Sequence, residues 1–130
     1  MKESFLLDTH TLLWFFEGNE SLSKEALNKI KLTSNRCFVS IVSLWEMAIK
    51  INLGKLKLEI DFKTFGAILH KNDIEILQIT FEHLLVLMSL EDHHRDPFDR
   101  IIISQAKHEG IPIITTDSFI REYKDITVVW

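Results

Sequence analysis

The sequence predicts an α/β domain with three layers, in which helices cover both faces of a central, mainly parallel sheet. Short apolar segments alternate with helical stretches of roughly ten residues, which is the pattern of repeated βαβ units. Acidic residues directly follow two of the apolar segments and stand near the starts of two predicted helices. In a parallel sheet these positions meet at one edge, and α/β proteins keep their sites at that edge.

The first forty residues supply two strands and two helices of this pattern. Residues 5–7 form an apolar run that predicts the first buried strand, which ends at Asp8. Residues 9–16 are apolar almost all round and predict a helix, with Thr9 in a position to cap it. A second helix is expected over residues 23–32, and a short β-prone strand over residues 37–40.

The middle of the chain continues the alternation. Ser43 and Glu46 match a capping box, Ser-x-x-Glu, so we expect them to head a helix that runs toward Gly54. The segments that follow predict an extended connector, a helix, a strand and an amphipathic helix, at residues 56–60, 62–71, 74–79 and 81–90.

The last third begins with a well-marked helix start. Asp96 is a suitable cap, and Pro97 suits the first helical position because its missing N–H has no partner there in any case. Asp99 falls in the first turn, on the face that carries Ile102, Ile103 and Ala106 and must pack inward. The helix is expected to stop at Gly110. Apolar runs at 111–115, followed by Asp117, and at 126–130 predict the last two strands.

Length and composition indicate one globular domain spanning residues 1–130. Hydrophobic residues make up 46% of the chain and charged residues 26%, and no apolar run reaches the length of a membrane span. The single Cys37 cannot form an internal disulfide, which favours a cytoplasmic setting. The net charge is −4, but residues 24–57 carry seven basic and two acidic residues, +5, so the remainder carries −9. These lysines suit either an ordinary solvated face or a phosphate backbone.

Four acidic residues are expected to converge at the carboxyl edge of the sheet. Asp8 and Asp117 follow strands, and Glu46 and Asp99 fall in first turns of helices. Clustered carboxylates repel unless they share a cation or a proton, and hard oxygen ligands without Cys or His favour magnesium or manganese. Such a site is typical of phosphoryl-transfer chemistry. Thr115 and Thr116 are placed to contact water or phosphate there.

Each acid also has a purely structural interpretation. Glu46 completes the capping box, and Asp99 offsets the dipole of its helix. Asp117 is placed to cap the short turn at residues 118–120, and Asp8 to cap the first helix. Only the set of four together therefore indicates a metal site.

Four motifs in order, LLDTH, SLWEMAIK, HHRDPFDR and TTD, resemble the PIN-domain nucleases, and more closely the VapC-type ribonuclease toxins of type II toxin–antitoxin systems. The resemblance covers essentially the whole chain. It implies a PIN-like three-layer fold, magnesium-dependent RNA cleavage leaving a 5′-phosphate and a 3′-hydroxyl, a homodimer, and inhibition by a cognate antitoxin. The residues that match the family's metal site are Asp8, Glu46, Asp99 and Asp117.

Within that site we expect Asp8 and Asp99 to ligate the metal directly. Glu46 and Asp117 are expected to bind through waters or to act on the attacking water. Asp96 most simply caps its helix, and Arg100 suits either a phosphate contact or a salt bridge.

Other polar and aromatic residues give weaker signals. His10 is a weak candidate for RNA contact, and His93 and His94 are expected in a solvated loop. Aromatic density exceeds the need of one small core, which favours a dimer seam or an antitoxin groove as well. The residues concerned are Trp14, Phe15, Phe16 and Trp45.

Two other classes of function compete with a nuclease. A phosphatase with an Asp nucleophile needs a second Asp two residues after Asp8, where His10 stands, and a receiver domain needs paired acids at the first strand end. A non-catalytic, metal-stabilised RNA-binding module fits the same residues and stays open.

Overall fold

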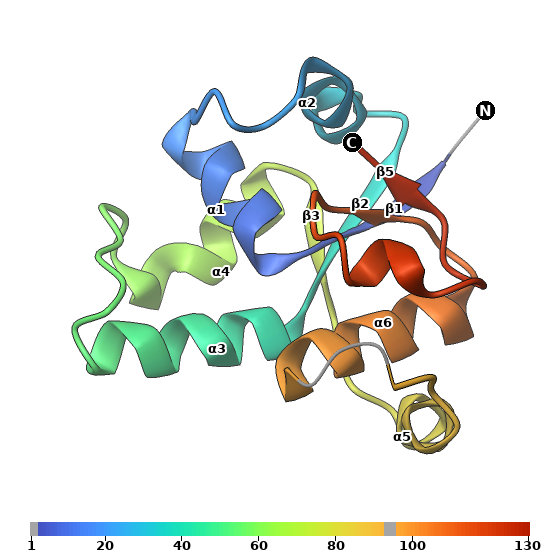
Figure 1. Ribbon diagram of the computed structural model, residues 1–130. Helices are drawn as coiled ribbons and strands as arrows, with labels where there is room; N and C mark the ends of the chain where they lie inside the picture. The colour runs from blue at the N-terminus through green and yellow to red at the C-terminus, as the bar shows by residue number, and fades with distance from the viewer. Residues whose placement is uncertain (1–2, 93–95) are drawn as a thin grey trace.

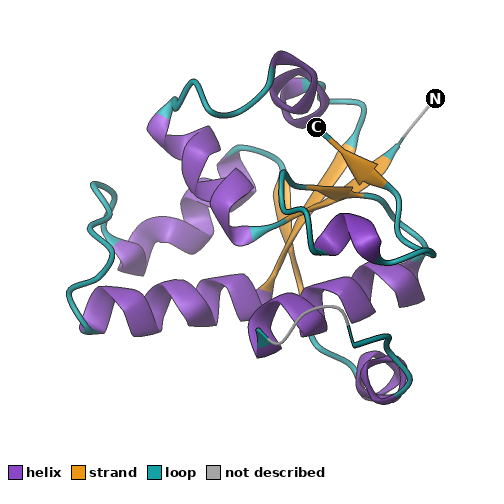
Figure 2. Cartoon of the chain, viewed as in Figure 1, coloured by secondary structure: helices purple, strands orange, loops and turns teal. Residues whose placement is uncertain are grey.

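Five parallel strands form the centre of the molecule, with helices packed on both faces (Figures 1 and 2). The computed structural model describes residues 3–92 and 96–130. The strands lie in the order β3-β2-β1-β4-β5, and every neighbouring pair is parallel. Their bounds are β1 Ser4–Leu7, β2 Arg36–Ser40, β3 Ile74–Leu77, β4 Ile113–Ile114 and β5 Val128–Val129. The predicted three-layer fold with a parallel sheet is confirmed.

Alternating strand residues feed two separate cores. Phe5 and Leu7 of β1 lie in the core beneath α1, α2 and α4, whereas Leu6 lies in the core beneath α5 and α6. Figure 1 shows these two helix groups on opposite sides of the sheet. The helices are α1 Thr9–Glu17, α2 Lys24–Lys31, α3 Ile41–Asn52, α4 Phe62–Lys71, α5 Phe81–Met88, α6 Pro97–Glu109 and the 3₁₀ helix η1 Ile120–Glu122.

The second and third strands are added to the sheet on one side of β1, and the last two are added on its other side. From β1 it proceeds outward to β2 and β3, and it then returns to the other side of β1 as β4. Leu7 and Ile114, the last residues of β1 and β4, are register partners. The residues that follow these two strands therefore meet at a topological switch point, which is where open α/β sheets bind ligands.

Several predicted boundaries are longer than the observed ones. The strands expected over 74–79, 111–115 and 126–130 are shorter in the structure. Residues 56–60, expected as a connector, lie between α3 and α4 outside any helix or strand. An apolar run in the sequence indicates which residues are buried, whereas the bounds of a strand depend on its hydrogen bonds to neighbouring strands. The run and the strand therefore differ at the ends of short strands. The helix expected over 81–90 likewise ends at Met88.

The start of α3 corrects the predicted capping box. Ser40, the last residue of β2, caps the helix by accepting a hydrogen bond from the Val42 N–H at 3.0 Å. Ser43 and Glu46 are therefore helix residues, and Glu46 lies in the second turn and not in the first. A serine directly at the strand end satisfies an early helix N–H, and it lets the buried Val42 join the first turn.

Two further findings bear on the setting of the chain. No helix within the described ranges is long and apolar enough to cross a membrane. Cys37 is buried, and burial raises the pKa of its thiol to about 11, so it remains protonated at neutral pH.

Candidate metal centre at the carboxyl edge of the sheet

Asp8 lies at the switch point with its carboxylate turned into the protein. It is only 7% exposed and caps α1, since its Oδ1 accepts the Thr11 N–H at 2.8 Å. The cap of α1 is thus Asp8 and not Thr9. Its Oδ2 accepts a short hydrogen bond from the Thr115 hydroxyl. Burial raises the pKa of Asp8, and the hydrogen bonds from Thr115 and Thr11 only partly oppose this.

Thr115 also connects Asp117 to Asp8 by hydrogen bonds. The Thr115 hydroxyl oxygen accepts the Asp117 N–H at 3.0 Å while its proton goes to Asp8. Asp117 Oδ1 accepts the Phe119 N–H at 2.8 Å, so the predicted capping of the 118–120 turn is confirmed. Asp8 and Asp117 line one pocket of about 250 Å³. The whole lining is Asp8, His10, Thr11, Trp14, Thr116 and Asp117.

Glu46 is connected to the start of α1. It is 8% exposed, and its Oε1 lies 2.9 Å from the hydroxyl of Thr9, the residue after Asp8. That hydroxyl also lies 2.9 Å from Ser43 Oγ. The second oxygen of Glu46, Oε2, forms an ion pair with Lys50 Nζ at 3.1 Å, one helical turn along α3. Both Glu46 oxygens are therefore held by protein groups.

Asp99 lies half-buried in the first turn of α6. Asp96 caps this helix by accepting the Phe98 N–H at 2.9 Å, and Pro97 occupies the first position, as predicted. The rings of Phe98 and Trp45 meet edge to face with centroids 5.1 Å apart, which places the start of α6 beside the first turns of α3. Asp99 and Glu46 thus belong to neighbouring helix starts.

The four predicted carboxylates share one edge of the sheet but do not form a tight cluster. Within residues 3–92 and 96–130, no three of them bring ligand oxygens within 4.8 Å of one another. Asp8 has no ion-pair partner in this part of the chain, and the charge of His10 only partly opposes the rise in the pKa of Asp8 that burial causes. The carboxylates that share this edge are hard oxygen donors, and their chemistry fits Mg²⁺ or Mn²⁺.

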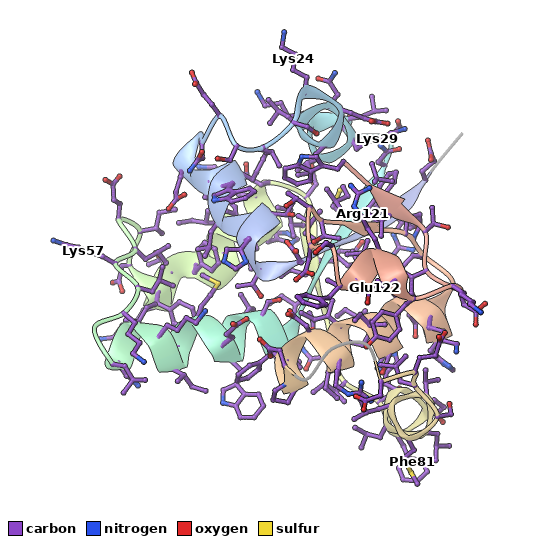
Figure 3. The ribbon with its side chains drawn as sticks, in the orientation of Figure 1. Lys24, Lys29, Lys57, Phe81, Arg121 and Glu122 are labelled. Carbon is purple, nitrogen blue, oxygen red and sulfur yellow. The ribbon has the colours of Figure 1, made fainter. Side chains whose placement is uncertain are left out.

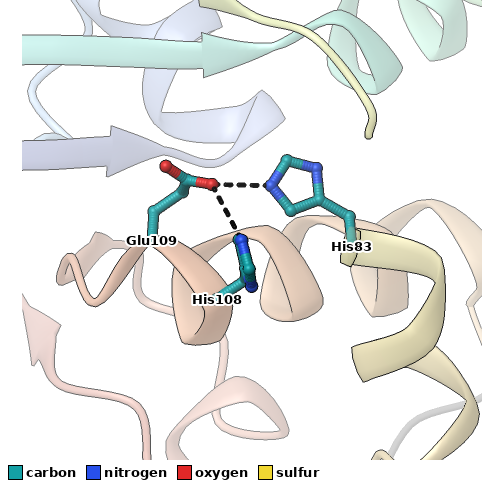
Figure 4. Close-up of side chains that lie close together, drawn as sticks. All are labelled: His83, His108 and Glu109. Carbon is teal, nitrogen blue, oxygen red and sulfur yellow. Dashed lines mark hydrogen bonds and ion pairs between the residues drawn. The ribbon is translucent and has the colours of Figure 1, made fainter. Parts of the chain in front are cut away.

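A second polar cluster lies between α5 and the last turn of α6, where sequence reasoning identified none (Figure 4). His83 of α5 is fully buried, and its Nε2 lies 2.9 Å from Glu109 Oε2 of α6, with His108 Nε2 3.9 Å from the same oxygen. His83 Nδ1 accepts the Thr80 N–H at 3.0 Å, so the ring proton sits on Nε2 and points at Glu109. A proton at this nitrogen blocks metal ligation. The cluster therefore joins two helices, and only the Thr-x-x-His spacing hinted at it.

Arg100 and His10, two further residues singled out in the sequence, differ in their surroundings. Arg100 donates to the Glu91 carbonyl at 3.1 Å and lies 3.9 Å from Asp92, which favours the salt-bridge interpretation over a phosphate contact. His10 is exposed and lines the pocket of Asp8. The expectation for His93 and His94 lies outside the described residues.

The seven basic residues of the 24–57 segment do not form one surface. Lys24 and Lys29 project from α2, whereas Lys57 projects far from them beyond α3 (Figure 3). Three of the seven form ion pairs: Lys29 with Glu3, Arg36 with Glu75 and Lys50 with Glu46. The solvated-face interpretation therefore fits most of them.

The chain is similar in sequence pattern and in fold to known proteins. The PIN domain family model matches residues 5–126. Similar solved structures include VapBC2 from Rickettsia felis bound to a DNA fragment from its promoter, with a TM-score of 0.72 and 15% identity, covering 97% of each chain. DNA-bound VapBC from Salmonella typhimurium has a TM-score of 0.71 and 17% identity over 98% of this chain and 97% of the other.

FitAcB from Neisseria gonorrhoeae is also similar, with a TM-score of 0.61 and 15% identity over 97% of this chain and 96% of the other. No curated protein sequence matched. Since the family model covers nearly the whole chain, this protein belongs to the PIN domain family. PIN domains are in general nucleases.

Proposed function

We propose that this chain is a magnesium-dependent ribonuclease, with manganese as an alternative metal, and that it is the toxin of a toxin–antitoxin pair. The observation that carries the proposal is Asp8, a carboxylate only 7% exposed, without an ion-pair partner in the described residues, at the switch point of the sheet. Membership of the PIN family and the fold shared with VapBC chains support it.

The carboxylates divide the chemistry among them. Asp8 and Asp99 are the proposed direct ligands of the metal, because Asp8 caps α1 at the switch point and Asp99 lies in the first turn of α6. A bound Mg²⁺ supplies Lewis-acid polarisation of the phosphodiester and lowers the pKa of water. Glu46 and Asp117 orient the attacking water and accept its proton. The water oxygen bonds to phosphorus and the P–O3′ bond breaks. A proton from solvent then converts the leaving 3′-oxygen into a 3′-hydroxyl, and the other product is a 5′-phosphate.

The test is to incubate the purified protein with a broad RNA panel and Mg²⁺, with and without EDTA. We expect cleavage that EDTA abolishes, and that Asp99→Asn abolishes while Glu59→Gln, at an exposed acid away from the site, leaves unchanged. RNA binding without EDTA-sensitive cleavage would instead support the metal-stabilised RNA-binding module. Cleavage that survives Asp99→Asn would remove Asp99 from the metal site.

An apolar groove supports the antitoxin as a partner. It has a volume of about 670 Å³, lies between α1, α2 and α4, and has Lys24 and Lys31 at its rim. Its apolar and aromatic lining is Trp14, Phe15, Phe16, Leu22, Leu27 and Ile68. Grooves of this kind take an amphipathic segment with acidic flanks. Three of the aromatic residues that exceeded the need of the core line this groove.

The antitoxin proposal is testable with the product of the neighbouring reading frame. We expect it to bind this chain and to inhibit RNA cleavage, and the double variant Lys24→Glu/Lys31→Glu to weaken the inhibition. Inhibition that both charge reversals leave unchanged would place the antitoxin elsewhere. A matched change, Lys55→Glu, lies outside the groove and is expected to leave inhibition intact.

A homodimer in the cytoplasm completes the proposal. Exposed apolar residues gather on α5, with Phe81 69% and Met88 85% exposed, and Figure 3 shows Phe81 projecting from the molecule. Exposed apolar patches mark interaction surfaces. Light scattering of wild type and of Met88→Lys tests this: we expect a dimer that the lysine weakens, and a monomeric wild type would remove it. The thiol state of Cys37 suits a reducing compartment.

A further inference from the structure

Two aromatic rings form one wall of the pocket that holds Asp8 and Asp117. His10 and Trp14 lie one helical turn apart on α1, with ring centroids 6.0 Å apart and planes inclined at 53°. His10 is exposed and Trp14 half-buried. Both rings line the pocket, so they face the same space as the two carboxylates.

The Trp14 ring is held in place by packing. The ring of Trp130 meets it edge to face, with centroids 5.8 Å apart and planes at 63°. Trp14 also packs against the core beneath α1. A ring that packing holds loses little conformational entropy when a ligand stacks on it, which favours binding.

The dimensions of the pocket limit what can stack there. Its volume of about 250 Å³ lies just below the range of about 300–1,000 Å³ for small-molecule sites. It therefore suits one planar group and not a base pair. The Thr116 residue of its lining offers a hydroxyl at the exposed rim.

We propose that His10 and Trp14 form a stacking subsite for one nucleobase next to the cleaved phosphate. The inference rests on the proposed ribonuclease function and adds a binding determinant to it. Aromatic rings stack on every base because each base has a π-face, and removing one such contact weakens binding about 5- to 150-fold. The base that enters must be unstacked from its neighbours, because the pocket admits a single ring system. The competing interpretation is that His10 merely covers Trp14 on the helix surface.

The experiment combines removal of one base from the RNA with removal of one aromatic ring from the protein. A short single-stranded RNA with one mapped cleavage site is compared with versions in which each nucleotide flanking that site is made abasic in turn. With wild-type protein, we expect the abasic change at one flanking position to lower kcat/KM by about 5- to 150-fold. With His10→Leu, the parent and abasic RNAs should be cleaved at nearly equal, lower rates, because the contact is already absent.

A second readout does not depend on cleavage. Fluorescence anisotropy in EDTA measures the binding of the same fluorescein-labelled parent and abasic RNAs by the metal-free protein. Wild type should prefer the parent, and His10→Leu should lose the preference. His70→Leu, at an exposed histidine of α4, is the matched control and should keep it. Trp14→Phe retains an aromatic ring and should keep most of the preference for the parent RNA. This variant guards against a folding defect in variants that lose the ring.

The outcomes separate the subsite from the nuclease activity. Wild-type protein without EDTA-sensitive cleavage overturns the proposed function, and the subsite with it. EDTA-sensitive cleavage with no abasic penalty at any flanking position overturns the subsite alone. A penalty that persists in full in His10→Leu also overturns the subsite, because it assigns the base contact to other residues.

Discussion

Asp8 and His83 are both buried polar residues, but they differ in how their hydrogen-bonding capacity is used. His83 has partners on both ring nitrogens, with the Thr80 N–H on Nδ1 and the Glu109 carboxylate at Nε2. Asp8 accepts two hydrogen bonds but forms no ion pair within the described residues, and the charge of His10 opposes its burial only in part. A satisfied buried group stabilises the fold, whereas an unbalanced buried charge destabilises it until a ligand arrives.

The comparison also shows why proximity alone is a poor guide to a metal site. The ligand atoms of His83, His108 and Glu109 lie within 4.8 Å of one another, yet their hydrogen bonds commit them to each other. The four acids are less compact, yet they combine hard oxygen donors with a charge that is only partly compensated. Donor chemistry and protonation therefore decide which of these two groups of residues is suited to bind a metal.

The largest expected effect is that of Asp8→Asn on catalysis. We expect EDTA-sensitive RNA cleavage to fall by more than about 100-fold, which is the upper range for residues that only support a metal ligand. Asparagine is also a favourable helix cap, so α1 should remain formed and circular dichroism should be unchanged. Mg²⁺ should raise the Tm of wild type and not that of the variant. Near-normal cleavage by the variant would contradict the role given to Asp8.

The next effect concerns stability at the other cluster. His83→Ala leaves the Thr80 N–H and Glu109 without their buried partner, and we expect unfolding free energy to fall by about 2–4 kcal/mol. Urea unfolding measures it, with the exposed His108→Ala as a control expected to change stability by less than about 1 kcal/mol. Metal affinity should be unaffected in both variants. If His83→Ala abolished tight Zn²⁺ binding by wild type, the cluster would be a metal site after all.

A smaller effect should appear in the pH dependence of stability without metal. Burial raises the pKa of Asp8 above 3.8, so native protein binds more protons than unfolded protein between these two pKa values. Asp8 therefore lowers wild-type stability as pH rises through that window. In EDTA, the stability of Asp8→Asn relative to wild type should grow with pH across the window and then level off. A relative stability that declines with pH would show that the Asp8 carboxylate is compensated.

The smallest expected effect is at Lys50, whose ammonium occupies Glu46 Oε2 at 3.1 Å. Lys50 is partly exposed, and such pairs contribute about 0.2–1 kcal/mol, so Lys50→Gln should raise Mn²⁺ affinity by about 1.5- to 5-fold. Isothermal titration calorimetry measures this, with Lys55→Gln as the control. A weaker affinity in Lys50→Gln would mean that the lysine orients Glu46 for the metal and does not compete with it.

Much of the fold could be predicted because it depends on periodicity and on strand connectivity. The apolar run that ends at Asp8 and the cap-and-proline start at Asp96 are local signals, and both elements form where expected. Parallel crossover geometry then places Asp8 and Asp117 at one edge without any distance information. The roles of the four acids remain predictions.

The parts that could not be predicted depend on contacts between distant residues. Glu46 was assigned to a first turn because Ser43-x-x-Glu46 resembles a capping box, but Ser40 competes for the same role and wins by its position at the strand end. The hydrogen bond from Thr115 to Asp8 joins residues 107 positions apart, and the His83–Glu109 contact joins residues 26 positions apart. Neither contact produces a periodic pattern in the sequence, so neither could be predicted from it.

The separation between Asp8 and Thr115 has a consequence for the protein's own synthesis. The pocket requires β4 to be inserted beside β1, and β4 comes late in the chain. A chain still on the ribosome with its last quarter unmade has Asp8 but lacks Thr115, Asp117 and the strand that carries them. Because the contacts that close the site are also the ones of highest sequence separation, they form late. Under the proposed function, we therefore expect a nascent chain to be unable to cleave RNA until translation is nearly complete.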